Sequence, residues 1–463
     1  MKISSKLLFL EVINFFREKT VRWAIAGLVL FGIYSFYHGK NVIGSQLETI
    51  SSIPSVQKTH LHHVAEEGKG KTVGTTAYYP FFYTANYPSP WASFSIGQRD
   101  VNAFSLKVKI LGIEGQLYDS ELTNPLTLLV GNLDASFVFI FLFPLLIIAF
   151  TYNTVSQEQE HGVWRIVETN APSLLTIIFI KLLVRFSAVV LTALIVFLAG
   201  VVWLGLPWSV PTFKLFLVIV CYLLFWFLLC AFVISLGKSS SFNATALVSC
   251  WIFLCMLFPG IANVLISGQI AIPEALETTV RQREGYHAKW DLPKKPTMET
   301  FYAAYPQYRK YPIPEDEYSP GWYYAMQYAG EVEARESAGQ LFTKLAQRQA
   351  LAEQIGMLNP VIYAQQMLNR IAETDLTSHI AYLQSVKSYH KQLREFFYPY
   401  IFENVQTENL DWTSYPKYQA KTAHREAASA SVLPLIVWSV LAGLSAILLM
   451  RRNFIQHTNR QNA

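Results

Sequence analysis

The chain has 463 residues, of which 52% are hydrophobic and only 15% are charged, and its mean hydropathy is positive. This composition excludes an ordinary soluble globular protein and indicates several membrane spans. The formal net charge is +5. It requires no nucleic-acid partner, because a bias of Lys and Arg toward the inner side of a membrane explains it.

Apolar stretches along the chain predict the fold class. A helix needs about 20 mostly apolar residues to cross the hydrocarbon core of a bilayer. We therefore expect an all-α polytopic membrane protein with six transmembrane helices. The stretches that qualify are Val21–Tyr37, Asp134–Tyr152, Ser173–Leu206, Phe213–Leu236, Phe242–Ser267 and Val432–Met450. Residues 173–185 of the third stretch carry two basic residues and are expected to lie partly in the interface.

The two ends of the chain predict its orientation. Basic residues precede the first span and follow the last one, namely Lys2, Lys6, Arg17, Lys19, Arg22, Arg451, Arg452 and Arg460. By the positive-inside rule both termini are expected inside the cell. Residues 1–20 are then an inner interfacial helix and residues 451–463 an inner tail. Two long segments, residues 38–133 and 268–431, are expected to face outward.

The two outward segments differ in pattern. The first is rich in turn residues, and its stretch "FSLKVKILGI" alternates apolar and basic residues, which predicts a half-buried strand. The second is expected to be mainly helical. Its helical pattern is interrupted before Asn359-Pro360 and again near Thr374-Asp375, so a helical hairpin packed over the spans is the prediction.

Two short motifs in the first outward segment suggest ligands only weakly. Gly70-Lys71-Thr72 resembles the end of a phosphate-binding loop but lacks the first glycine and a preceding buried strand, so we expect a flexible basic loop. The "HLHH" stretch places His60, His62 and His63 close together. Without a nearby carboxylate or Cys they are weak metal candidates, and a solvated loop is the favoured interpretation.

The loop between the second and third spans, residues 153–172, is dense in acid. Glu158 and Glu160 precede Gly162, and Arg165 follows it. A short amphipathic helix on the inner membrane surface is expected, with Gly162 able to break it or to let another surface approach closely. The alternative is a solvated connector with ordinary charges.

Polar residues near the membrane boundaries are also candidates for function. Arg99, Asp100 and Asp134 lie at the predicted outer boundary, where Asp134 is expected at headgroup level or paired with Arg99. Lys181 and Arg185 share one face of the third span near its inner end, and they are expected to reach the inner headgroups.

The order of these features resembles a type-2 ATP-binding-cassette (ABC) transporter permease subunit. The resemblance lies in a long external loop after the first span and an inner "E-x-E-x-G-x-x-R" stretch after the second. Glu158, Glu160, Gly162, Arg165 and Lys181 match, whereas Gln159 and Val163 depart from the usual Arg and Thr. The stretches "FSIGQRDV", "NPLTLLVGNLDASFVFIFLFPLL" and "LNPVIYAQQMLNRIAETD" are similar to the bacterial branch known as domain of unknown function 3526.

The resemblance implies a bacterial inner-membrane subunit that is not itself an enzyme and holds no cofactor. A separate ATPase subunit would bind ATP and Mg, dock on Glu158–Arg165 and drive movement of a substrate, most simply export. A second permease subunit, identical or related, would complete the unit within the lipid bilayer. The alternatives are a non-transporting machine that transmits force to external partners, and a metal-sensing membrane receptor.

Overall fold

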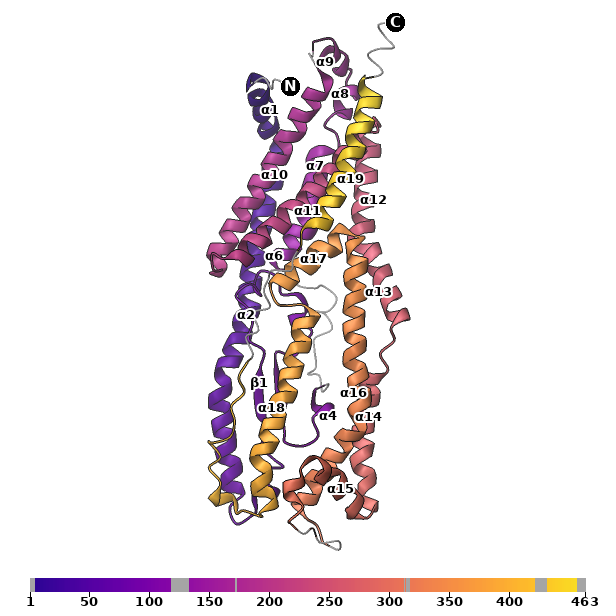
Figure 1. Ribbon diagram of the computed structural model, residues 1–463. Coiled ribbons are helices and arrows are strands. Elements are labelled where there is room, and N and C mark those ends of the chain that lie inside the picture. Colours follow the sequence, from indigo (N-terminus) through magenta and orange to yellow (C-terminus); the bar gives the residue numbers. More distant parts are fainter. Residues whose placement is uncertain are drawn as a thin grey trace.

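The computed structural model describes residues 5–117, 133–170, 173–311, 313, 317–420 and 431–455. It is 77% helical and elongated, with the apolar helices gathered in one half and a second helical body beyond them (Figure 1). Among the described residues six helices are long and apolar enough to cross a membrane. The predicted class, a helical multi-pass membrane protein whose second extramembrane segment is mainly helical, is therefore confirmed.

The helix α11 (Val210–Ile234) is central among the spans. It packs against helices of the second, third, fifth and sixth spans. Its neighbours are α7 (Phe143–Thr151), α10 (Leu174–Leu204), α12 (Ser240–Ile252) and α19 (Leu433–Met450). The first span, in α2 (Lys19–Glu67), lies against α10. We call the end that carries α1 (Ser5–Arg17), α8 (Ser156–Glu160) and α9 (Trp164–Asn170) the terminal end, because α19 also finishes there (Figure 1).

Two spans contain a widened π-helical turn just before a proline. The second span runs from α6 (Ala135–Phe137) through Val138–Leu142 into α7, and the fifth from α12 through Phe253–Leu257 into α13 (Phe258–Gln269). A proline lacks the N–H that would bond to the preceding turn, so a carbonyl loses its partner. Tyr222 donates its hydroxyl hydrogen to the carbonyl of Ile140 at 2.7 Å, four residues before Pro144. This bond compensates for the missing donor inside the bundle.

The first long helix differs from the sequence prediction. α2 does not end near Tyr37 but continues as one helix of 49 residues to Glu67, with Pro54 inside it. Residues expected to form turns and short extended patches therefore stand as a rod beyond the spans (Figure 1). The buried side of the distal part of α2 includes Gln46, Ile50, Gln57 and Leu61. The two glutamines interrupt the apolar stripe that would identify an amphipathic helix in the sequence.

The body beyond the spans, residues 40–117 and 270–420, is called the distal half. A small antiparallel sheet pairs β1 (Phe82–Ala85) with β2 (Ser105–Val108), Phe82 opposite Val108. The strand predicted in "FSLKVKILGI" is thus present. The remaining helices are α3 (Val73–Thr76), α4 (Glu114–Leu117), α14 (Glu274–His287), α15 (Lys294–Ala304), α16 (Pro320–Met357), α17 (Pro360–Ile371) and α18 (Leu376–Phe402), with 3-10 turns at Gly97–Asp100, Ala288–Asp291, Pro306–Tyr308 and Thr407–Asn409.

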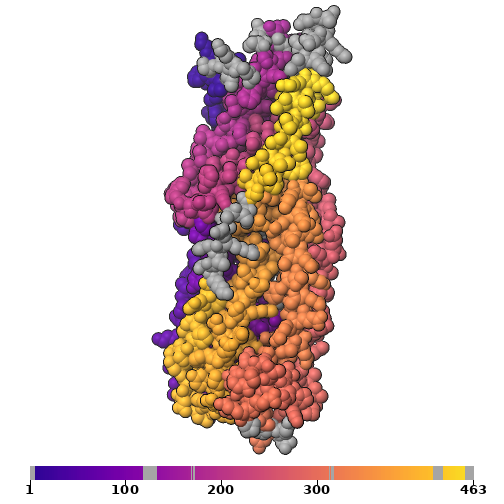
Figure 2. Space-filling view, in the orientation of Figure 1, coloured from indigo at the N-terminus to yellow at the C-terminus, as the bar shows by residue number. Residues whose placement is uncertain are grey.

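The helical breaks in the distal half fall where the sequence places them. α16 ends at Met357, before Asn359-Pro360, and α18 begins after Asp375, whose carboxylate caps its N-terminus. α17 lies between them as a short elbow against the spans, while α16 and α18 point away from the membrane half (Figure 1). In the space-filling view these two helices cover one face of the distal half (Figure 2). Two hydrophobic cores result, one among the spans and α17, the other aromatic and distal.

Candidate coupling surface

Two acids of the turn between the second and third spans, Glu158 and Glu160, bond to other parts of the same chain. Glu158 of α8 forms an ion pair with Lys181 of α10. Glu160 accepts hydrogen bonds from the backbone N–H and the hydroxyl of Ser240, at 2.7 and 3.0 Å, at the N-terminus of α12. A carboxylate is stabilised there by free N–H groups and by the helix dipole. The two glutamates therefore tie α8, which follows the second span, to the third and fifth spans.

The opposite side of the same turn exposes apolar residues. Gly162 has a φ of 72°, and a Cβ placed on it would meet nothing within 4 Å. Val163 and Ile166 are 44% and 64% exposed, and Arg165 is exposed beside them, whereas Trp164 is buried. We call Gly162, Val163, Arg165 and Ile166 the coupling surface. Its exposed apolar atoms and single basic group suit contact with another protein.

The N-terminal helix α1 is attached to the same end by a charged contact. Glu11 pairs with Arg185 of α10 at 2.6 Å, and Arg185 also donates to the carbonyl of Phe150 at 2.9 Å. Both charged side chains are only 13–14% exposed. Phe15 packs edge-on against Phe150 at 5.1 Å between ring centroids. Lys181 and Arg185 therefore both meet carboxylates, although the sequence favoured headgroup contacts for them.

At the opposite end of the spans, Asp134 and Arg99 are held by different partners. Asp134 is 3% exposed and accepts hydrogen bonds from the backbone N–H of Ile96 at 2.8 Å and of Phe137 at 2.9 Å, so it caps the second span. Arg99 donates to the side-chain oxygen of Gln46 on α2 at 3.0 Å. Burial lowers the pKa of Arg99 to about 10, which leaves it charged at neutral pH. The Arg99–Asp134 pairing that the sequence suggested is not among these contacts.

The described parts of the three stretches similar to the unknown-function branch meet at this boundary, and residues 124–132 of the second stretch lie outside the described residues. The Ser95 hydroxyl donates to the side-chain oxygen of Asn369 on α17 at 2.7 Å, and the backbone N–H of Gln98 donates to the carbonyl of Thr374 at 2.9 Å. Asp100, which ends the same 3-10 turn, is half-buried, and burial raises the pKa of its carboxyl group. Segments 94–101, 134–140 and 358–375 thus form one junction between the spans and the distal half.

The two weak ligand motifs have structural roles. Gly70 has a φ of 75°, and its backbone N–H donates to the carboxylate of Glu408 at 2.5 Å, so an acid stands where a phosphate would have to bind. The turn is tied to residues 405–408 rather than flexible, because the N–H of Thr407 donates to the carbonyl of Lys71 at 2.9 Å.

The histidines of "HLHH" belong to α2 and not to a loop. His60 accepts a hydrogen bond from the backbone N–H of Phe81 at 3.1 Å, and His63 lies 3.2 Å from Glu67. Within the described ranges, no group of three or more His, Cys, Asp or Glu side chains is arranged to hold a metal ion.

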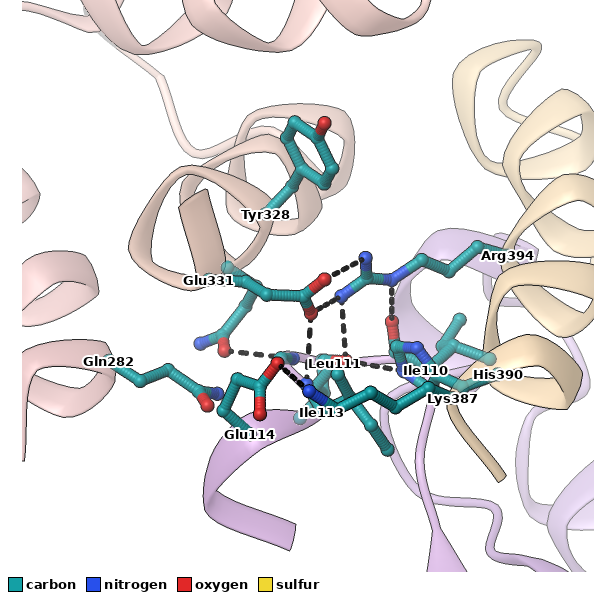
Figure 3. Close-up of polar contacts among 12 residues, drawn as sticks. Ile110, Leu111, Ile113, Glu114, Gln282, Tyr328, Glu331, Lys387, His390 and Arg394 are labelled. Atoms are coloured by element: carbon teal, nitrogen blue, oxygen red, sulfur yellow. Dashed lines mark hydrogen bonds and ion pairs between the residues drawn. The ribbon is translucent and has the colours of Figure 1, made fainter. Parts of the chain in front are cut away.

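A buried polar cluster in the distal half was not anticipated from the sequence. Arg394 of α18 pairs with Glu331 of α16 at 2.6 Å and donates to the carbonyl of Leu111 at 3.1 Å (Figure 3). Burial raises the pKa of the Glu331 carboxyl, but the charge of Arg394 and its hydrogen bonds to Glu331 outweigh this effect and lower that pKa to about 2. The N–H of Ile113 donates to Glu331 at 3.0 Å. Side chains of α16 and α18 therefore hold residues 110–115, which come from a distant part of the sequence. We call these residues the strap.

One signal in the sequence indicates where α17 begins. Asn359 precedes a proline at the start of a helix, the usual place of an N-cap. Its side-chain oxygen accepts from the N–H of Val361 at 2.9 Å, and its amide nitrogen donates to the carbonyl of Leu254 at 2.9 Å. Leu254 lies in the π turn of the fifth span, five residues before Pro259. Nothing in the sequence alone indicated this second bond.

One known family matches a large part of the distal half. Residues 275–421 match the family model described as a domain of unknown function, DUF3526. This part of the chain is similar to that family, and we call it the DUF3526 segment. It begins in α14 and includes α15, α16, α17 and α18, so the junction helix α17 and both partners of the Glu331–Arg394 pair belong to it. The predicted resemblance to this branch is confirmed. Neither a curated protein nor a solved structure matches the chain.

Proposed function

We propose that the chain is the membrane-spanning permease subunit of an ABC transporter and that it acts in export. A separate ATPase subunit would hold ATP and Mg and would bind the coupling surface. The chain itself would contribute no catalytic residue. The terminal end would then face the cytoplasm of a bacterial cell, with the DUF3526 segment outside the inner membrane.

This proposal rests mainly on the contacts that attach α8 to the spans. The Glu158–Lys181 pair and the Glu160–Ser240 bonds connect one short exposed turn to the third and fifth spans, while its chain continuity connects it to the second. A movement of α8 and α9, caused by a bound partner, would therefore be transmitted directly to the second, third and fifth spans. A solvated connector would need none of these contacts.

The acids and the coupling surface have different roles in this arrangement. The Glu158 and Glu160 side chains bond within the chain, so they transmit movement rather than contact the ATPase. Gly162, Val163, Arg165 and Ile166 face outward and would form the contact. This division differs from the docking by acids that the sequence resemblance implies.

A second candidate, a machine that transmits force to external partners without transport, is favoured by one feature. α2 runs without interruption from the first span into the distal half, and α17 connects that half to the fifth span through Asn359. Substrate flux into reconstituted vesicles distinguishes the two, because only a transporter moves solute across the bilayer when ATP is hydrolysed.

Both candidate functions require a bound ATPase, and the test of that requirement is co-purification of the chain with an ABC ATPase subunit expressed with it. Gly162→Leu and Ile166→Asp should reduce recovery of the ATPase about tenfold or more, since bulk and charge enter a contact that excludes water. Leu276→Asp is the matched control, because Leu276 is 73% exposed on α14, far from the terminal end (Figure 1). Normal ATPase recovery with both variants, at normal membrane abundance, would contradict the proposal.

A further inference from the structure

A cavity of about 680 Å³ opens in the distal half. This volume falls in the range of sites for small organic ligands, roughly 300–1,000 Å³. Its walls combine three basic residues with four aromatic ones, and none of the described residues that line it is acidic. The basic and aromatic residues are Lys107, Lys109, Arg283, Tyr78, Phe81, Tyr286 and Tyr323.

The alternation of β2 places two of the lysines in the cavity. Successive side chains of a strand point to opposite faces. Leu106 and Val108 belong to the distal core, whereas Lys107 and, just past the strand, Lys109 line the cavity. The "LKVKI" pattern therefore divides into an apolar face that packs in the distal core and a basic face whose lysines lie against aromatic rings, while Leu106 of the apolar face also borders the cavity.

Aromatic rings flank the Lys109 charge. Its Nζ lies 4.8 Å from the ring centroid of Tyr78 and 4.7 Å from that of Phe81. Burial lowers the pKa of Lys109. Tyr78 also meets Tyr323 of α16 edge-on at 5.8 Å. The lysine is thus held by rings rather than by a carboxylate, and its positive charge is available to an incoming group.

The floor of the cavity is held rigidly. The backbone N–H of Gly115 donates to the side-chain oxygen of Gln282 at 2.6 Å, and that of Gly112 donates to Gln327 at 3.4 Å. Both glutamines are buried and line the cavity. The same strap is also held by Glu331 and Arg394 (Figure 3). A site built on such supports needs little ordering when a ligand binds.

We infer that this cavity binds a small organic anion with an aromatic body. The basic residues would meet the anionic group, and the tyrosines and Phe81 would pack on the ring. A cationic ligand would meet three like charges and no acid among the lining residues. A bare inorganic anion would leave the aromatic walls without a partner. The inference goes beyond the transport proposal and does not depend on it.

The test is equilibrium dialysis of 2-naphthalenesulfonate against the full chain in lipid nanodiscs, with empty nanodiscs subtracted. The wild-type chain should bind it saturably, and the Lys107→Gln/Lys109→Gln variant should bind it about tenfold or more weakly, because charge-assisted contacts are lost. Lys58→Gln is the matched control, since Lys58 is an exposed lysine of α2 outside the cavity. The ammonium analogue, 2-naphthylmethylammonium, should not bind saturably.

A second variant tests the cavity without changing charge. Thr279 of α14 lines it, and Thr279→Trp should occupy part of the space and weaken binding by a similar factor while leaving both lysines in place. Thermal unfolding of each variant shows whether its fold is retained. Equal binding of the two naphthalene probes, binding by the wild type no stronger than by the lysine variant, or full binding by a folded Thr279→Trp chain would each overturn the inference.

Discussion

Single polar residues at buried positions connect parts of this molecule that are distant in sequence. Asn359 is fully buried, caps α17 and donates to a carbonyl of the fifth span. The sequence indicates such a residue only as a helix start, because its second partner lies 105 positions away. The same holds for Arg394 and Glu331, which look like ordinary charges on helical segments until the fold removes them from water.

Replacing Asn359 tests its double role. Asn359→Ala removes a helix cap and leaves the Leu254 carbonyl without its donor, so the free energy of unfolding should fall by about 2–4 kcal/mol. Asn359→Asp keeps the cap oxygen but cannot donate, so it separates the two contributions. Denaturant titration of the full chain in detergent measures both variants. A loss below about 0.5 kcal/mol for Asn359→Ala would contradict the assigned role.

Two histidines, the buried His390 and the half-buried His379, predict that the distal half weakens in acid. Burial and the Arg394 charge lower the pKa of His390 to about 3, and burial and Arg99 lower that of His379 to about 4. Both are neutral in the folded chain but protonate near pH 6.5 when unfolded. Their stabilisation is therefore complete above pH 6.5 and is lost as the pH falls toward the folded values, by up to about 2 kcal/mol each at pH 5.

The variants that check this dependence are His390→Gln and His379→Gln. Each should reduce the loss of unfolding temperature between pH 7 and pH 5 by about half, and the double variant should nearly abolish it. Glu331 contributes little in this window, because its unfolded pKa lies near 4.5 and its folded pKa at about 2. An unchanged pH slope in the double variant would show that other groups control the acid response.

At the scale of elements, the spans and the helical breaks were predictable and the long rod was not. The membrane helices could be identified because each contains an apolar stretch of about 20 residues, the length needed to cross the hydrocarbon core. Distal α2 was missed because Pro54 and polar residues hide its helical stripe, and because Gln46 and Gln57 are buried through hydrogen bonds rather than apolar contact. In the coupling turn the sequence indicated the residues, but their partners on α10 and α12 required the packed bundle.

For the whole molecule, the proposal fixes which end faces the cytoplasm. In a chain lacking Cys221, Cys230, Cys250 and Cys255, single cysteines at Ser55 and Ser388 should react with an impermeant thiol reagent in intact cells. One at Val163 should react only after the membrane is opened. All three positions are exposed, so accessibility of the side chain does not decide the result. Labelling of Val163→Cys in intact cells would reverse the orientation.

The central claim is that the Glu158–Lys181 pair transmits movement from the coupling surface to the third span. Glu158→Lys alone should leave the ATPase bound but strongly reduce ATP-driven activity of the complex, because two like charges replace a partly buried ion pair. The most direct measurement is this activity in the swapped variant, Glu158→Lys with Lys181→Glu. We expect substantial recovery, since the pair is restored within the chain. If the swap stays as inactive as Glu158→Lys, or if Glu158→Lys alone releases the ATPase, then Glu158 acts on the partner and the role assigned to the pair is wrong.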